Sequence, residues 1–262
     1  MHRNTMKKLA LAVAAPLFAV SAASAATLYS ETTTLTNPNF FVSQASATTG
    51  TNPTANDVLL DNVVVPSYPS PGAGGLNVTK VTVNTVQEAN APGGNLSLYY
   101  STITADRTNV SSPTISAPQL VGTQAMVAGN GASTSQSQIV YGNGVSTLFT
   151  LTDAQLNFTD PGVTTGAEFI LGFKNSSTSG LQGINLAKPD PGYENPVEYY
   201  EYNTVDNAQA TFTFFAQNDA NDGAGMWITV EGNFVPEPAT IGLAALGGLV
   251  MLARRPNRKE NA

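Results

Sequence analysis

The feature that most constrains the fold of this chain is a series of short stretches in which apolar and polar residues alternate, without a long amphipathic helical pattern between them. Alternation with a period of two places apolar side chains on one face of a β-strand, and that face must be buried. The β-prone stretches are residues 27–35, 58–65, 76–87, 96–100, 139–141, 145–151, 169–173, 208–216 and 226–230. We expect at most one helical turn, at residues 152–156. Many short strands without intervening helices predict an all-β fold, a single jelly-roll-like β-sandwich, with an up-and-down barrel as the alternative.

Two of these stretches also predict local geometry. In residues 76–87 the alternation changes phase near Lys80, which predicts a bulge or a register shift. Residues 139–141 and 145–151 flank the sequence Gly-Asn-Gly at positions 142–144, which predicts a hairpin with a three-residue loop.

The first 25 residues have the pattern of a secretory signal peptide. Three basic residues precede an apolar run of 12 residues, 9–20, which is too short to span a membrane. Small residues follow at positions 23–25, so we expect the Sec translocon to export the chain and signal peptidase to cut between Ala25 and Ala26. This leaves residues 26–235 as one exported domain, a length that suits a single β-sandwich.

The last 28 residues have three parts in a fixed order. The sequence Val235, Pro236, Glu237 and Pro238 is held extended by its prolines. Residues 239–253 carry no charge and would span about 22 Å as a helix, which suffices for a transmembrane helix if the bilayer thins slightly. Arg254 and Arg255 then form a basic stop that stays cytoplasmic.

This three-part order resembles the PEP-CTERM sorting signal of bacterial surface and exopolysaccharide-associated proteins. The resemblance rests on the four residues 235–238, the apolar segment and the two arginines, and it assigns residues 236–262 to the sorting signal. It implies that the membrane enzyme exosortase reads the motif, cuts near it and removes or exchanges the tail. Before processing, the C-terminal helix would hold the protein in the membrane. The alternative is an ordinary C-terminal anchor that follows a proline-rich linker.

The charge of residues 26–235 limits the partners of the exported domain. Four basic residues stand against 16 acidic ones, a formal net charge of −12. Such a surface argues against nucleic acid and anionic lipid as partners, and it is compatible with divalent cations and neutral glycans. The chain has no cysteine, so neither disulfides nor thiolate metal sites are available.

The same region lacks the side chains of the commonest catalytic arrangements. The one histidine of the chain, His2, lies in the signal peptide, so the exported domain has neither histidine nor cysteine. That excludes histidine-based serine triads, cysteine nucleophiles and ordinary zinc or copper sites. We therefore expect a protein that is not an enzyme. The alternative is a polysaccharide hydrolase that uses two carboxylates.

Two acidic clusters are the candidate contacts for a glycan or an ion. The denser one contains Asp190, Tyr193, Glu194, Glu198, Tyr199, Tyr200, Glu201, Tyr202 and Asp206. Tyrosines there would stack on sugar rings, but alternation over residues 197–202 equally describes an ordinary edge strand. The second cluster, with Asp219 and Asp222, lies before a glycine as in a calcium loop. It departs from the calcium-loop pattern at two positions, so an incidental turn is the stronger interpretation and bound calcium the weaker one.

Together these observations predict an exported surface or extracellular-matrix protein that is sorted by exosortase. Its domain would be a structural or adhesive module associated with exopolysaccharide. The candidate contacts are Tyr193, Glu198, Tyr200, Asp219 and Asp222, and the alternative remains a hydrolase or a calcium-assisted glycan-binding module.

Overall fold

The computed structural model describes ten segments of the chain, all within one compact unit, Ala25–Val235. These segments are residues 25–34, 41–42, 57–68, 74–103, 115–158, 166–176, 182–193, 199–203, 209–211 and 225–235. The sorting segment 236–262, the residues before 25 and most of the 208–216 stretch lie outside the described residues.

The strands of the described residues form two antiparallel sheets. The nine-stranded sheet has the path β1-β15-β5-β11-β14, with β2 and β3 also on β11 and with β8 and β9 on β5. Its strands are β1 (Ala26–Glu31), β2 (Thr33–Thr34), β3 (Phe41–Val42), β5 (Gly75–Gln87), β8 (Ser135–Gly142), β9 (Phe149–Thr152), β11 (Gln182–Lys188), β14 (Gly225–Met226) and β15 (Ile228–Val235). The six-stranded sheet has the order β13-β12-β4-β10-β6-β7. Its strands are β4 (Asp57–Val65), β6 (Gly94–Ser101), β7 (Gln119–Met126), β10 (Ala167–Asn175), β12 (Tyr199–Asn203) and β13 (Gln209–Thr211).

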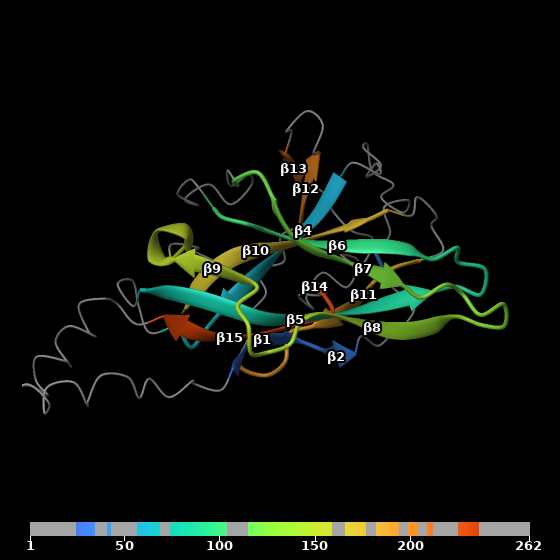
Figure 1. Ribbon diagram of the computed structural model, residues 1–262, viewed down its shortest axis with the longest axis horizontal. Helices are drawn as coiled ribbons and strands as arrows, with labels where there is room; N and C mark the ends of the chain where they lie inside the picture. The colour runs from blue at the N-terminus through green and yellow to red at the C-terminus, as the bar shows by residue number, and fades with distance from the viewer. Residues whose placement is uncertain are drawn as a thin grey trace, which may run out of the picture. The chain divides into compact units, whose positions relative to one another are not determined.

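The two sheets lie one over the other as two layers (Figure 1). This arrangement confirms the all-β prediction and the sandwich-like architecture. Among the described residues the one helix is a 3-10 turn, Asp153–Gln155, where the single helical turn was expected. In that part of the chain no helix has the length and apolar character needed to cross a membrane.

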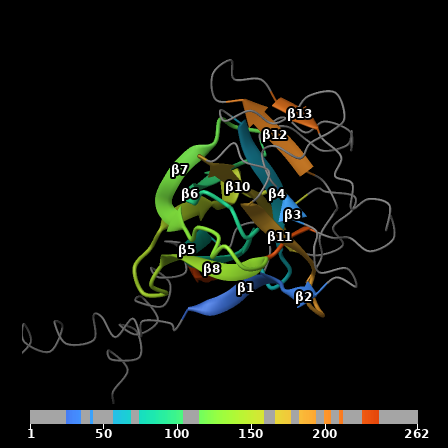
Figure 2. The ribbon, with the colours of Figure 1, turned by 90° about the vertical axis from the view of Figure 1, so that its right-hand side faces the viewer.

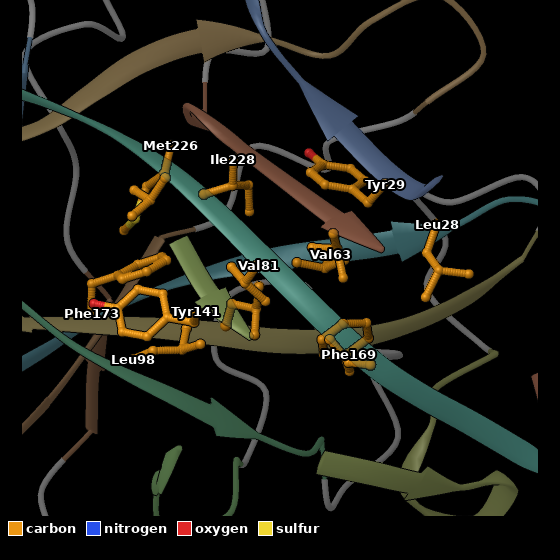
Figure 3. Close-up of a cluster of buried hydrophobic side chains, with 14 of the residues drawn as sticks. Leu28, Tyr29, Val63, Val81, Leu98, Tyr141, Phe169, Phe173, Met226 and Ile228 are labelled. Carbon is orange, nitrogen blue, oxygen red and sulfur yellow. The ribbon is translucent and has the colours of Figure 1, made fainter. Parts of the chain in front are cut away.

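The hydrophobic core lies between the sheets. Val63 of β4 and Phe169 of β10 contribute from the six-stranded sheet, and Val81 of β5 and Ile228 of β15 from the other (Figure 3). All four are completely buried. Burial of one such side chain contributes about 1.5–3 kcal/mol to stability. The alternation along residues 169–173 and 226–230 therefore reports the inward faces of these strands correctly.

The 13-residue strand β5 carries the predicted bulge. Lys80 pairs with Glu231 and Val78 pairs with Gly232, so Thr79 has no residue opposite on β15. Its Oγ1 donates a hydrogen bond to the Glu231 carbonyl at 3.2 Å. The phase change near Lys80 is thus a β-bulge, which confirms that prediction.

The predicted hairpin at residues 142–144 is wrong. Both β8 and β9 pair antiparallel with β5, β8 along Lys80–Gln87 and β9 along Gly75–Val78, so they run in the same direction on one edge. The loop between them crosses the bulge, because the Gly144 N–H donates to the Thr79 carbonyl at 3.3 Å and the Leu148 N–H to the Val78 carbonyl at 2.7 Å. Gly142 allows this path: its φ is 77°, and a Cβ there would lie 2.3 Å from the Thr79 oxygen.

The first and last strands of the unit lie side by side. Ala26 of β1 pairs with Gly232 of β15, and β15 also pairs along β5, so the last strand lies between the first and the longest. The close approach requires glycine at position 232, because a Cβ would meet the Asn77 carbonyl at 2.1 Å. Both ends of the described unit are therefore built into the nine-stranded sheet.

Candidate functional site

The structure describes part of the predicted acidic and aromatic cluster. Tyr193 is described with its side chain, and the backbone of Tyr200 lies on β12, paired with Leu60 of β4 and with Thr211 of β13. Because β12 lies between β4 and β13, the strand prediction for this stretch is confirmed, but its placement at an edge is wrong. Glu198, Asp219 and Asp222 lie outside the described residues, so their roles stay predictions.

Asp190 of the cluster is held by the first part of the chain. Its carboxylate accepts hydrogen bonds from the Thr32 Oγ1 at 2.7 Å, the Thr33 Oγ1 at 2.8 Å, the Thr32 N–H at 3.3 Å and the Ser30 hydroxyl. The Asp190 N–H in turn donates to the Ser30 carbonyl at 3.0 Å. Asp190 thus fastens the segment that follows β11 to strands β1 and β2.

These hydrogen bonds decide the charge of Asp190. Burial would raise its pKa, but the donors from Ser30, Thr32 and Thr33 outweigh burial and lower the pKa below 3.8. A carboxylate that stays ionised and is occupied by four donors is poorly suited to give a proton to a glycosidic oxygen. Its geometry indicates a structural role.

Tyr193 packs into the same corner. Its N–H donates to the Asp190 carbonyl at 3.0 Å, and its half-buried ring meets the Tyr29 ring edge-on, with 5.8 Å between centroids. Burial and then the negative charge of Asp190 raise the pKa of its hydroxyl. This ring packs against the sandwich core, so only part of it is available to a sugar.

Two further carboxylates, Asp61 and Glu31, lie in the interior of the sandwich, and the sequence did not single them out. Asp61 of β4 and Glu31 of β1 are both completely buried although they belong to different sheets. Asp61 Oδ2 accepts the Met226 N–H at 2.8 Å, and Glu31 Oε1 accepts the adjacent Gly225 N–H at 2.6 Å. The Tyr29 hydroxyl donates to Glu31 Oε2 at 2.8 Å. The short strand β14 is therefore held by one acid from each sheet.

Burial raises the pKa of Asp61 from 3.8 to about 7, although the N–H groups of Met226 and Asn62 act in the opposite direction. Neutral pH therefore lies near the midpoint of its titration. A sequence signal existed, because Asp61 and Asn62 interrupt the apolar stretch 58–65, and a polar pair inside a buried strand requires partners. The pair Asp61 and Glu31 is enclosed by the core and occupied by backbone donors, so it serves the fold.

The described residues contain no group of three or more acidic side chains that would hold a metal ion. Their one printed ion pair joins Lys80 to Glu231 at 2.7 Å, beside the bulge of β5. The calcium expectation concerned Asp219 and Asp222, which the structure does not describe, and it stays a prediction.

The sorting segment follows the last strand without a gap, since β15 ends at Val235. Residues 234–259 match the PEP-CTERM protein-sorting motif. The match includes Val235, Pro236, Glu237, Pro238, Arg254 and Arg255, and it confirms the resemblance drawn from them. Such a motif implies an exosortase-sorted protein that is exported to the cell surface. No curated protein and no solved structure matches this chain.

Proposed function

We propose that residues 26–235 form a non-catalytic structural or adhesive module that associates with exopolysaccharide at the cell surface. The observation that carries the proposal is the sorting motif at residues 234–259, because it directs whatever precedes it to the outside of the cell. The body that it delivers is a β-sandwich rich in serine, threonine, asparagine and glycine and poor in charge, a composition compatible with neutral glycan hydroxyls.

The delivery has three proposed steps. The Sec translocon exports the chain and signal peptidase cuts between Ala25 and Ala26, just where β1 begins. The apolar segment 239–253 then holds the precursor in the membrane while exosortase acts at residues 235–238. Nucleic acid is not a partner, because the body carries 16 acidic residues against four basic ones.

The acids that the structure places support a non-catalytic body. Asp190 is occupied by four donors, and Asp61 and Glu31 are buried and bound to the backbone of β14. Each of them is explained by the fold, which leaves catalysis without an assigned carboxylate pair among them.

The proposal is tested by equilibrium binding of the exported body to exopolysaccharide from the producing bacterium, with and without calcium. We expect binding without release of reducing sugar ends at any pH. Absence of binding would contradict the adhesive role, and hydrolysis abolished by Glu198→Gln would establish the hydrolase instead. The mass of the exported protein checks the delivery, because it should begin at Ala26.

The sorting step has its own test. Replacing Pro236, Glu237 and Pro238 with alanine should leave a full-length precursor in the membrane, while the thermal unfolding of the body is unchanged. Normal processing of that variant would show that exosortase does not read these residues.

A further inference from the structure

The two strands β7 and β8 share a property that the rest of the body lacks. Residues 108–152 contain no charged side chain, and both strands lie in this stretch, in a body with a formal net charge of −12. Among the described residues β7 pairs with β6 alone and β8 with β5 alone, so each leaves one edge unpaired. Natural proteins usually protect such edges with charges, because a free edge is a template for another strand.

The same stretch exposes apolar side chains. Five large apolar side chains are exposed among the described residues, and four of them lie here: Leu120, Val127, Val140 and Val145. Figure 2 shows β7 and β8 on the same side of the sandwich, and a Cβ added at Gly122 of β7 would lie 3.8 Å from the Tyr141 ring of β8. Exposed apolar groups on an uncharged pair of strands mark a contact surface.

The strand β8 is the better of the two for pairing. It matches β5 residue by residue from Ser135 to Gly142 without a register shift, so its free edge is regular over eight residues. In β7 the register shifts between Leu98 and Tyr99 of its partner strand, which bulges the edge at Val121. A regular edge offers its N–H and C=O groups at the spacing of a neighbouring strand.

We propose that β8 pairs antiparallel with β8 of a second copy of this chain. The copy is the favoured occupant because two bodies of the same negative charge repel except where they meet along this uncharged edge. A two-fold axis at Gln138 places Gln136 of each copy opposite Val140 of the other. Ile139 and Tyr141 then remain turned toward their own cores, where both are buried, and the two sheets become one continuous sheet.

The bonds at the contact follow from this register. The free N–H and C=O groups of β8 bond to each other across the axis, and glutamine and valine side chains cover the outer face. Because the net charges of the two bodies repel, added salt strengthens the dimer by screening them. This association does not depend on the binding of a glycan.

The experiment is sedimentation of the exported protein over a range of concentrations, as wild type and as two matched variants. Gln138→Lys places two cations against each other at the axis and should weaken dimerisation about tenfold or more. Gln124→Lys makes the same change of net charge on β7, where the side chain is also exposed, and should leave the dimer constant within about twofold. Amide exchange of residues 135–142 should slow as the protein concentration rises.

Three results would overturn the proposal. They are a protein that stays monomeric up to its solubility limit, a dimer that Gln124→Lys weakens as much as Gln138→Lys does, and amides of β8 whose exchange is independent of concentration. Glycan binding that maps to β8 without any dimer would also reject it. If Gln138→Lys lowers the melting temperature, Gln136→Lys replaces it, since that side chain is exposed on the same face.

Discussion

Asp61 and Asp190 carry the same side chain in two opposite environments. Asp61 is completely buried between the sheets, and burial raises its pKa to about 7. Asp190 lies in a partly exposed turn, where donors from Ser30, Thr32 and Thr33 overcome the effect of burial and lower its pKa. The comparison teaches that the number of donors and the access of water, rather than the residue type, decide whether an aspartate in this fold is charged.

The two residues therefore make stability depend on pH with opposite signs. The folded state holds the Asp61 proton more tightly than the unfolded state, so the stability linked to it is present at acid pH and is lost as the pH rises through about 7. The stability linked to Asp190 is present above pH 3.8 and is lost as the pH falls through its lowered pKa.

The largest expected effect is the alkaline side of this comparison. Between pH 4 and pH 8 the free energy of unfolding should fall by about 4 kcal/mol through Asp61 alone, as a pKa raised by about three units implies. Urea unfolding at several pH values measures the slope. Asp61→Asn cannot titrate and should flatten it, so an unchanged slope in that variant would assign the effect to another group.

The second effect is the loss of the buried acceptor. At pH 5, Asp61→Ala should lower the free energy of unfolding by about 3 kcal/mol, because the N–H groups of Met226 and Asn62 lose their partner and a cavity remains. Asp61→Asn keeps a side-chain oxygen and should cost less. Equal losses in the two variants would show that the hydrogen bonds contribute little.

The smallest effect concerns the surface aspartate. Asp190→Ala should lower the free energy of unfolding at pH 7 by about 1 kcal/mol, because water replaces part of the lost hydrogen bonds. The difference from wild type should shrink below pH 4, where the wild-type carboxylate begins to be protonated. A loss as large as that of Asp61→Ala would contradict the distinction between interior and surface.

Much of the fold could be predicted from the sequence because strand burial follows a period of two. The phase change near Lys80 predicted the bulge at Thr79, and the stretches that became β4, β10 and β15 were assigned as strands. The sequence could not distinguish a hairpin from two collinear strands, since Gly142 serves either geometry. That choice depends on β5, which offers one long edge to both β8 and β9.

The candidate site was predictable mainly where it is a linear signal. The sorting motif is read by an enzyme as an extended peptide, so its residues are adjacent in sequence and matched at once. Asp61 was missed because its partners, Gly225 and Met226 with Glu31, come from the far ends of the chain. Asp190 was grouped with neighbouring acids, but in the fold its partners are hydroxyls more than 150 residues away.

The place of β15 between β1 and β5 sets the time at which this domain can form. Ala26 must find Gly232, and Gly75 must find Val235, so the nine-stranded sheet cannot close until the last strand has crossed the membrane. Pairings of such long sequence separation also form slowly. A chain that is threaded outward from its N-terminus therefore stays unfolded during transport and completes its sheet only as the sorting segment reaches the bilayer.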